Sequence, residues 1–239
     1  MIIKKKIGVV CQCRVSSKRL KNKIILKICG KPILFYLINR LKKIKCDKII
    51  FAVADELGKE KIIDIIKNSF DKSAIYVGSV NNVLERTLQA SNKFEIDTII
   101  RVTSDCPFID PHLINKGIKI FEKKKLDYLS NNLKKTFPLG LDFEIFSTDA
   151  LNKSSMLSKH KLNKEHVTWF IKKSKKFKKF NISNTHYDER KIRLTLDYMS
   201  DYLNFKKILE NNLILTREFS WRKLKLLLQN KSNKESCKK

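Results

Sequence analysis

The chain has 239 residues, of which 42% are hydrophobic, so it is long enough to bury a substantial core. Its net charge of +28 would ordinarily indicate a nucleic-acid-binding protein, but 43 of the 52 basic residues are lysines, and isoleucine and asparagine are also abundant, as an A+T-rich genome would produce. No apolar run approaches the roughly 20 residues of a membrane-spanning helix, and the first residues lack a signal-peptide pattern, so we expect no membrane insertion.

The first half of the chain alternates between strand and helix patterns. This alternation predicts an α/β fold with a mostly parallel sheet and helices on both faces. The predicted strands are Ile7–Cys13, Lys48–Ala54, Ala74–Gly78 and Asp97–Thr103, and the predicted helices are Ile33–Ile44, Lys59–Phe70, Val83–Phe94 and Pro111–Lys124.

The second half does not keep this alternation of strands and helices. This change favours a mixed sheet. We expect one domain over residues 1–230 and a disordered basic tail over 231–239, because no Gly/Ser linker or internal repeat divides the chain. The predicted strands are Asp127–Asn131, Leu141–Ser147, Phe177–Ser183 and Ile192–Asp197, and the predicted helices are Leu162–Lys173, Ser200 to about Asn211, and Trp221–Gln229.

A basic loop follows the first predicted strand. Ligands bind at the carboxyl ends of strands in open α/β sheets, and cations with hydroxyl groups at that place suit a polyphosphate. The glycines of a Walker loop are absent. A solvated basic loop is the alternative. The candidate residues here are Gln12, Arg14, Ser17, Arg19 and Lys23.

Two apolar segments end in an aspartate, Asp105 and Asp197. If both segments are central parallel strands, the two carboxylates emerge at the same sheet edge as the basic loop. Magnesium prefers one or two carboxylates together with substrate phosphates, so this arrangement predicts a Mg²⁺ site. Alternatively, each aspartate caps the following helix, or Asp105 closes a turn before Pro107.

The six cysteines form no C-x-x-C pair and no histidine cluster accompanies them, so a zinc site is not expected. Free thiols suit a reducing compartment, and we expect a cytoplasmic protein.

Several segments occur together in a fixed order. Through these segments, taken in this order, the sequence resembles the cytidylyltransferase family of spore-coat polysaccharide biosynthesis proteins. That family is related to the acylneuraminate and 3-deoxy-manno-octulosonate cytidylyltransferases. The resemblance covers roughly Ile7 to Leu209. Its segments are Gln12–Lys23, Gly30–Pro32, Thr103–Pro111, Gly140–Glu144, Glu165–Thr168 and Leu196–Tyr202.

The resemblance implies a Rossmann-like, three-layer nucleotide-diphospho-sugar transferase fold. It implies that Gln12, Arg14, Ser17, Arg19, Lys23, Ser79, Arg86 and Asp105 bind the nucleotide, with Arg14, Lys23 and Asp105 catalytic. Asp105 and Asp197 are expected to hold Mg²⁺. Cys13 and Lys21 replace the family's alanine and proline in the first loop, and Tyr198-Met199-Ser200 replaces its usual T-P-E.

The resemblance also implies an acceptor pocket around Asp142, Glu144 and His166. Asp142 and Glu144 are two residues apart, which places them on one face of a predicted strand. An exposed polar strand face is the alternative for this pair, and a structural role is the alternative for the lone histidine.

The function implied is a Mg²⁺-dependent transfer of CMP from CTP to a sugar-like acceptor, with release of pyrophosphate, in cell-surface polysaccharide biosynthesis. The resemblance also implies a homodimer. Two alternatives are a sugar-phosphate nucleotidyltransferase that uses another NTP and a non-catalytic nucleic-acid-binding protein. The first usually has a glycine-rich first loop, which is absent here, and the second lacks its binding motifs.

Overall fold

The computed structural model describes residues 5–184, 189–210 and 220–226. Its main feature is a seven-stranded sheet in the order β5-β4-β1-β6-β8-β7-β9. The strands are β1 (Ile7–Cys13), β4 (Lys48–Ala54), β5 (Ala74–Gly78), β6 (Thr98–Thr103), β7 (Tyr128–Ser130), β8 (Glu144–Ser147) and β9 (Lys179–Asn181). Of these strands only β8 runs antiparallel to its neighbours.

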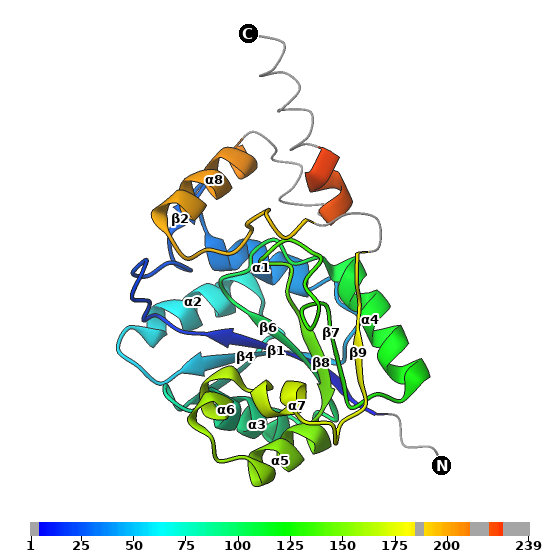
Figure 1. The fold of residues 1–239 in the computed structure, drawn as a ribbon. Coiled ribbons are helices and arrows are strands. Elements are labelled where there is room, and N and C mark those ends of the chain that lie inside the picture. Colours follow the sequence, from blue (N-terminus) through cyan, green and yellow to red (C-terminus); the bar gives the residue numbers. More distant parts are fainter. Residues whose placement is uncertain (1–4, 185–188, 211–219, 227–239) are drawn as a thin grey trace.

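Helices cover both faces of this sheet, which confirms the predicted three-layer α/β architecture (Figure 1). Apolar side chains of one helix set pack with β1, β4 and β6 in the largest core cluster, and a second set covers the opposite face, where α3, α5 and α7 supply apolar side chains to a second cluster. The first set is α1 (Ile33–Leu41), α2 (Lys59–Ser69) and α4 (Pro111–Lys124), and the second is α3 (Val83–Lys93), α5 (Thr148–Leu157), α6 (Lys161–His166) and α7 (Trp169–Lys173).

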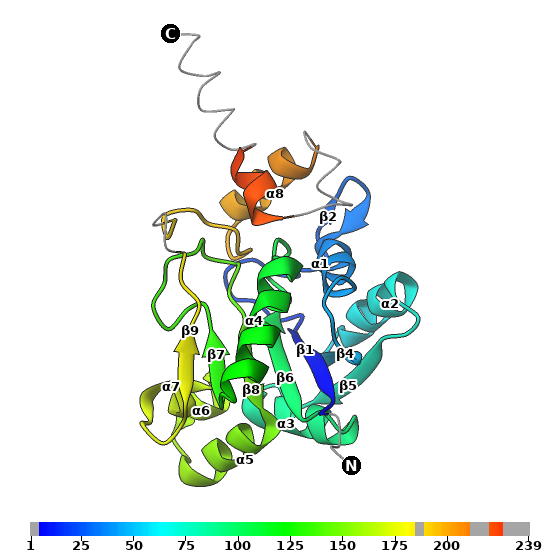
Figure 2. The same cartoon turned by 90° about the vertical axis from the view of Figure 1, so that its right-hand side faces the viewer.

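A third apolar cluster joins α8 (Met199–Glu210), helical residues 221–226 and a short pair of strands, β2 (Lys27–Ile28) and β3 (Lys31–Pro32). These elements lie together at one end of the molecule, above α1 (Figure 2). Among the described residues, none of the helices combines the length and apolar character needed to span a bilayer. The predicted tail, 231–239, lies outside the described residues.

The predictions for the first half are confirmed closely, because its strands are parallel strands with apolar runs and its helices α3 and α4 carry clear N-caps. The Asn82 side chain accepts from the Glu85 amide at the start of α3. The Asp110 carboxylate accepts from the amides of His112 and Leu113 at the start of α4, where Pro111 occupies the first turn.

Several features of the second half differ from the predictions. The helix expected at Leu162–Lys173 is two short helices, because Val167 interrupts it with a φ of 55°. Helix α5 was not expected. The strand expected at Leu141–Ser147 begins only at Glu144, so Asp142 lies outside it and does not share a strand face with Glu144.

The strand predicted at Ile192–Asp197 is also absent, and only an isolated bridge pairs Arg193 with Leu139. The segment is instead fixed by backbone hydrogen bonds. The Leu194 amide donates to the Leu139 carbonyl at 2.6 Å, and the Leu196 amide donates to the Asp105 carbonyl at 2.8 Å. Asp197 therefore reaches the carboxyl edge of the sheet by a different route from the one the sequence suggested.

Gly140 permits this route. Its φ is 102°, and a Cβ atom there would lie 2.3 Å from the carbonyl carbon of Leu194. Gly30, with a φ of 72°, would meet nothing within 4 Å and thus offers a matched comparison.

We expect Gly140→Ala to destabilise the protein more than Gly30→Ala. Both changes force a side chain into the left-handed region, at a cost of about 1–2 kcal/mol. Only the first also pushes residues 193–197 away. Thermal unfolding should show the difference, since each kcal/mol lowers Tm by about 2–4 °C in a chain of this size. Equal losses for the two variants would show that the close approach at Gly140 is unimportant.

Candidate active site

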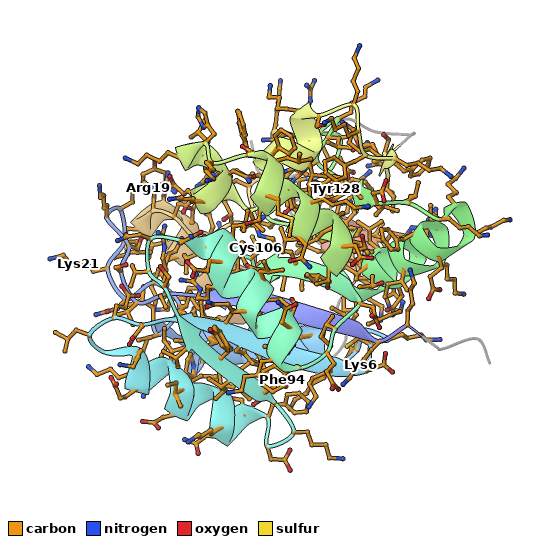
Figure 3. The ribbon with its side chains drawn as sticks, turned by 90° about the horizontal axis from the view of Figure 1, so that it is seen from below. Lys6, Arg19, Lys21, Phe94, Cys106 and Tyr128 are labelled. Carbon is orange, nitrogen blue, oxygen red and sulfur yellow. The ribbon has the colours of Figure 1, made fainter. Side chains whose placement is uncertain are left out.

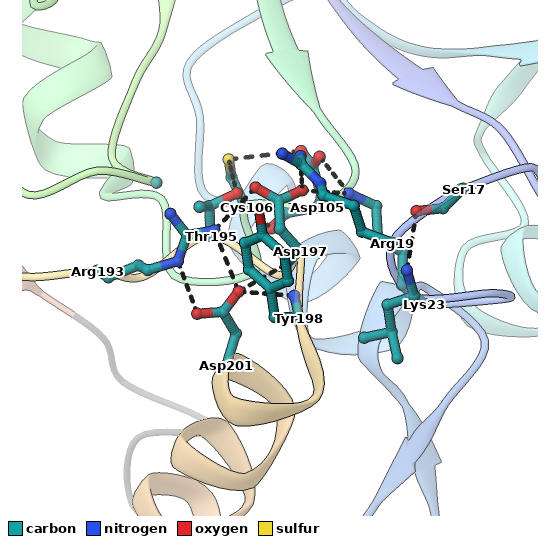
Figure 4. Close-up of polar contacts among 12 residues, drawn as sticks. Ser17, Arg19, Lys23, Asp105, Cys106, Arg193, Thr195, Asp197, Tyr198 and Asp201 are labelled. Atoms are coloured by element: carbon teal, nitrogen blue, oxygen red, sulfur yellow. Dashed lines mark hydrogen bonds and ion pairs between the residues drawn. The ribbon is translucent and has the colours of Figure 1, made fainter.

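The site is built around one ammonium group between two carboxylates. The Nζ of Lys23 donates to Asp105 Oδ2 at 2.7 Å and to Asp197 Oδ1 at 3.0 Å (Figure 4). The Lys23 side chain is only 7% exposed. The structure thus brings together the basic loop and both predicted strand-end aspartates, although they are 82 and 174 residues from Lys23 along the chain.

The basic loop leaves the carboxyl end of β1, where Arg19 and Lys21 lie, while Lys6 lies at the opposite end of the sheet (Figure 3). Its first part is held by Glu56, whose carboxylate accepts from the backbone amides of Val15 and Ser16. Its last part is anchored by buried Leu20 and Ile24. This anchoring gives a long, flexible lysine side chain a defined position.

Asp197 contacts three cations. Besides Lys23, Arg19 contacts Oδ1 at 2.7 Å and Arg193 contacts Oδ2 at 2.9 Å. Burial by itself raises the pKa of Asp197, but the hydrogen bonds and charges of Lys23 and Arg19 outweigh it and hold this pKa below its usual value. Asp197 is therefore an ionised carboxylate.

Asp201 orients this end of the site. Its Oδ2 accepts from the amides of Asp197 and Tyr198 at 2.8 and 2.9 Å, and its Oδ1 accepts from Arg193 Nε at 2.7 Å. The guanidinium groups of Arg19 and Arg193 both lie near the Tyr198 ring, 5.1 and 5.4 Å from its centroid. Three carboxylates and three cations are thereby balanced in one cluster.

Arg86 is a second positive charge near the loop. It is 2% exposed, and its NH1 donates to the Ser79 carbonyl, while Nε has no partner. No ion pair joins it to a carboxylate within the described part of the chain. Burial lowers its pKa, and nearby Arg14 lowers it further. A buried, unbalanced cation beside exposed Arg14 favours an anionic ligand here.

In this structure the hydroxyl groups of Ser79 and Ser17 contact backbone amides within their own turns. The Ser79 hydroxyl accepts from the Asn82 amide at 3.0 Å, and the Ser17 hydroxyl lies 3.5 Å from the Leu20 amide. The Gln12 side chain likewise makes two hydrogen bonds. Its Oε1 accepts from Arg101 at 2.8 Å, and its Nε2 donates to the Thr87 hydroxyl at 3.0 Å. Gln12 is 8% exposed, so it borders the loop from within the core.

Glu144 is 2% exposed and lies in a buried network. Its carboxylate pairs with Arg101 and with Lys172 at 2.6 Å, and accepts from the hydroxyls of Tyr128 at 2.6 Å and Thr168 at 2.7 Å. Burial opposes ionisation, yet Arg101 and Lys172 lower the pKa of Glu144 well below its usual value.

The other predicted acceptor residues lie apart from this network. Asp142 is half-buried and accepts from the Gly140 amide at 3.2 Å, and burial raises its pKa. His166 is exposed at the end of α6. In Glu165-His166-Val167-Thr168 it is therefore Thr168, not His166, whose side chain reaches Glu144.

Sequence reasoning missed the residues that position the site. The spacing of Arg193, Asp197 and Asp201 in steps of four could have indicated mutual contact, because the latter part begins a helix. No local signal marked Glu56, whose role depends on the neighbouring strand β4. The partners of Glu144 come from β6, β7 and α7 with its N-cap residue Thr168, so their meeting is visible only in the fold.

The pair Asp105 and Asp197 fits a divalent metal ion. Both present carboxylate oxygens to one point, now taken by an ammonium group. Among the described residues no cluster of three or more His, Cys, Asp or Glu side chains exists, so the protein offers a hard, two-carboxylate site that phosphate and water oxygens would complete.

We expect Glu144→Gln to destabilise the protein at neutral pH by about 3–5 kcal/mol, because Arg101 and Lys172 lose their buried counter-charge. Since the folded-state pKa is lowered, the wild type gains stability from this carboxylate above the unfolded pKa of about 4.3 and loses it as the pH falls below that value. The difference in free energy of unfolding between the two proteins, measured by urea unfolding, should therefore become smaller from about pH 7 to about pH 3.5. Exposed Glu165→Gln is the control. A constant difference across the range would contradict the assignment.

Comparison with known proteins finds similar chains over most of the sequence. A solved cytidylyltransferase from Leptospira borgpetersenii is similar, with a TM-score of 0.90, 29% identity and 96% of each chain covered. An uncharacterized protein of Methanocaldococcus jannaschii is 38% identical over 199 residues, 82% of this chain and 79% of the relative. The spore coat polysaccharide biosynthesis protein SpsF of Bacillus subtilis is 26% identical over 211 residues, 83% and 84% of the two chains.

The family model for cytidylyltransferases matches residues 9–230, a range that contains every residue of the cluster around Lys23. This chain therefore belongs to the cytidylyltransferase family, and it is a nucleotidyltransferase.

Proposed function

We propose that this protein transfers CMP from CTP to a hydroxyl group of a sugar-acid or related acceptor, with release of pyrophosphate, for cell-surface polysaccharide biosynthesis. Family membership supports the nucleotidyl transfer, and the similarity to SpsF supports the pathway class. The observation that carries the proposal is the convergence of the first-loop cations with Asp105 and Asp197 at the carboxyl edge of the sheet.

The chain's part in this reaction is mainly alignment and charge neutralisation. Arg14, Arg19 and Lys23 bind the triphosphate and offset the charge that develops on the leaving pyrophosphate. Buried Arg86 adds a fixed positive charge beneath the loop. The nucleotide is bordered by Ser17, Ser79 and Gln12. The hydrogen bonds of the Gln12 side chain to Arg101 and Thr87 keep the start of the loop in place.

Asp105 and Asp197 are the residues that hold Mg²⁺. When bound, the ion supplies charge stabilisation at the transferred phosphoryl group. Cys106 follows Asp105 directly, but burial raises the pKa of its thiol, so this side chain is a neutral packing group and not a nucleophile.

The acceptor binds on the side of Asp142, the half-buried carboxylate beside Gly140. Glu144 contributes by fixing Arg101 and Thr168 behind this surface, because it is itself buried. His166, at the exposed end of α6, is a further candidate for contact with the acceptor. A cytoplasmic homodimer is part of the same proposal.

We expect CTP with Mg²⁺ to raise Tm more than ATP, GTP or UTP does. Binding to the native state at a hundredfold excess over Kd stabilises a protein by about 2.7 kcal/mol. Differential scanning fluorimetry measures this shift, and pyrophosphate release with a panel of sugar-acid acceptors measures turnover. Equal shifts from all four nucleotides would contradict cytidylyl specificity.

We expect Asp105→Asn and Asp197→Asn each to lower turnover by two orders of magnitude or more while the fold is kept, because the metal loses a charged ligand. The double variant should lose little beyond the worse single variant, since the two residues act as a unit. Exposed Asp149→Asn controls for the loss of one carboxylate. Near-normal turnover of either single variant at saturating Mg²⁺ would assign that residue to helix capping.

A further inference from the structure

The ammonium of Lys23 occupies the point toward which the two acidic side chains converge. It lies 2.7 Å from Asp105 Oδ2 and 3.0 Å from Asp197 Oδ1, and the side chain is almost fully buried. Two carboxylates this close repel each other unless a cation lies between them. In the unliganded protein that cation is supplied by the chain itself.

The two carboxylates depend on Lys23 to different degrees. Asp197 also contacts Arg19 and Arg193. Asp105 has Lys23 as its only ion-pair partner within the described part of the chain, and its Oδ1 otherwise faces only the Cys106 thiol at 3.6 Å. Removal of Lys23 would leave Asp105 without a counter-charge.

We propose that Lys23 is an internal counter-ion that excludes divalent metal from Asp105 and Asp197 until a triphosphate draws its ammonium away. The proposal rests on the proposed function, in which these aspartates hold the metal. A divalent ion and the ammonium compete for the same oxygens. Phosphate oxygens give the lysine new partners, and its flexible stem allows the shift.

This arrangement couples the binding of metal and nucleotide. A triphosphate that binds Lys23 frees the metal site, and by reciprocity a bound metal favours the state in which Lys23 faces the phosphates. The unliganded protein should therefore bind a divalent ion weakly, even though both carboxylates are already directed at one point.

The test is a titration of the nucleotide-free, full-length protein with Mn²⁺, with free Mn²⁺ measured by electron paramagnetic resonance. Lys23→Met should bind Mn²⁺ at least about tenfold more tightly than the wild type, a change of about 1.4 kcal/mol. Arg19→Gln removes a cation from Asp197 without freeing Asp105, so its gain should be smaller. Exposed Lys21→Gln should match the wild type.

The double variant K23M/D105N restores the charge balance and removes one ligand, so it should bind Mn²⁺ no better than the wild type does. If Lys23→Met is unfolded without metal, Mn²⁺ should restore its native circular dichroism. Binding by Lys23→Met no tighter than by the wild type, a gain no larger than that of Arg19→Gln, or no recovery by Mn²⁺ would overturn the proposal.

The outcome is independent of the catalytic assay. If the wild type transfers CMP but Lys23→Met gains no Mn²⁺ affinity, the counter-ion role fails and the proposed function stands. If no nucleotidyl transfer is found, the proposed function fails, while the Mn²⁺ titration still reports whether Lys23 blocks the two carboxylates.

Discussion

The contact of Lys23 with Asp105 and Asp197 joins three parts of the chain that are far apart in sequence. The lysine comes from the loop after the central strand β1, Asp105 follows β6, and Asp197 precedes α8. In a chain with a net charge of +28, carboxylates are scarce, and their gathering here sets the position of the basic loop. Asp201 and Arg193 continue the ion cluster to α8, whose apolar side chains pack with β2.

A second buried ion cluster, around Glu144, lies behind the first. Arg101 connects the two regions, since it pairs with Glu144 and donates to Gln12 at the end of β1. The buried charges cost desolvation energy and are stable only because every oxygen of Glu144 has a partner. This network is buried, whereas the Lys23 cluster includes the more exposed Arg19 and Arg193.

The basic residues fall into two groups, those exposed to solvent and those of the site. Many lysines are exposed to solvent, and some of them bond to nearby carbonyl groups, as Lys178 does with the Lys124 carbonyl at the end of α4. The cations of the site differ because they are held by carboxylates or by burial. Net charge alone therefore gave a poor guide to function, and the positions of a few arginines and one lysine gave a good one.

Local sequence patterns predicted the parallel half of the fold and pointed to the candidate residues that the structure brings together around Lys23. Apolar runs indicate buried strands, and caps and periodicity indicate helices. The strands β1, β4, β5 and β6 and their helices were therefore predictable. The motifs that carried the family resemblance contained Lys23, Asp105 and Asp197. These features are local, and the neighbouring residues contain the physical reason for them.

The way in which the second half completes the site depends on contacts between distant parts of the chain. The segment ending at Asp197 has a strand-like pattern, but it makes a single bridge and is fixed by the close approach at Gly140 and by the bond from Leu196 to Asp105. Glu144 has the pattern of an acceptor ligand, but four distant side chains bury it. Such outcomes depend on which distant groups meet, and no local pattern contains that information.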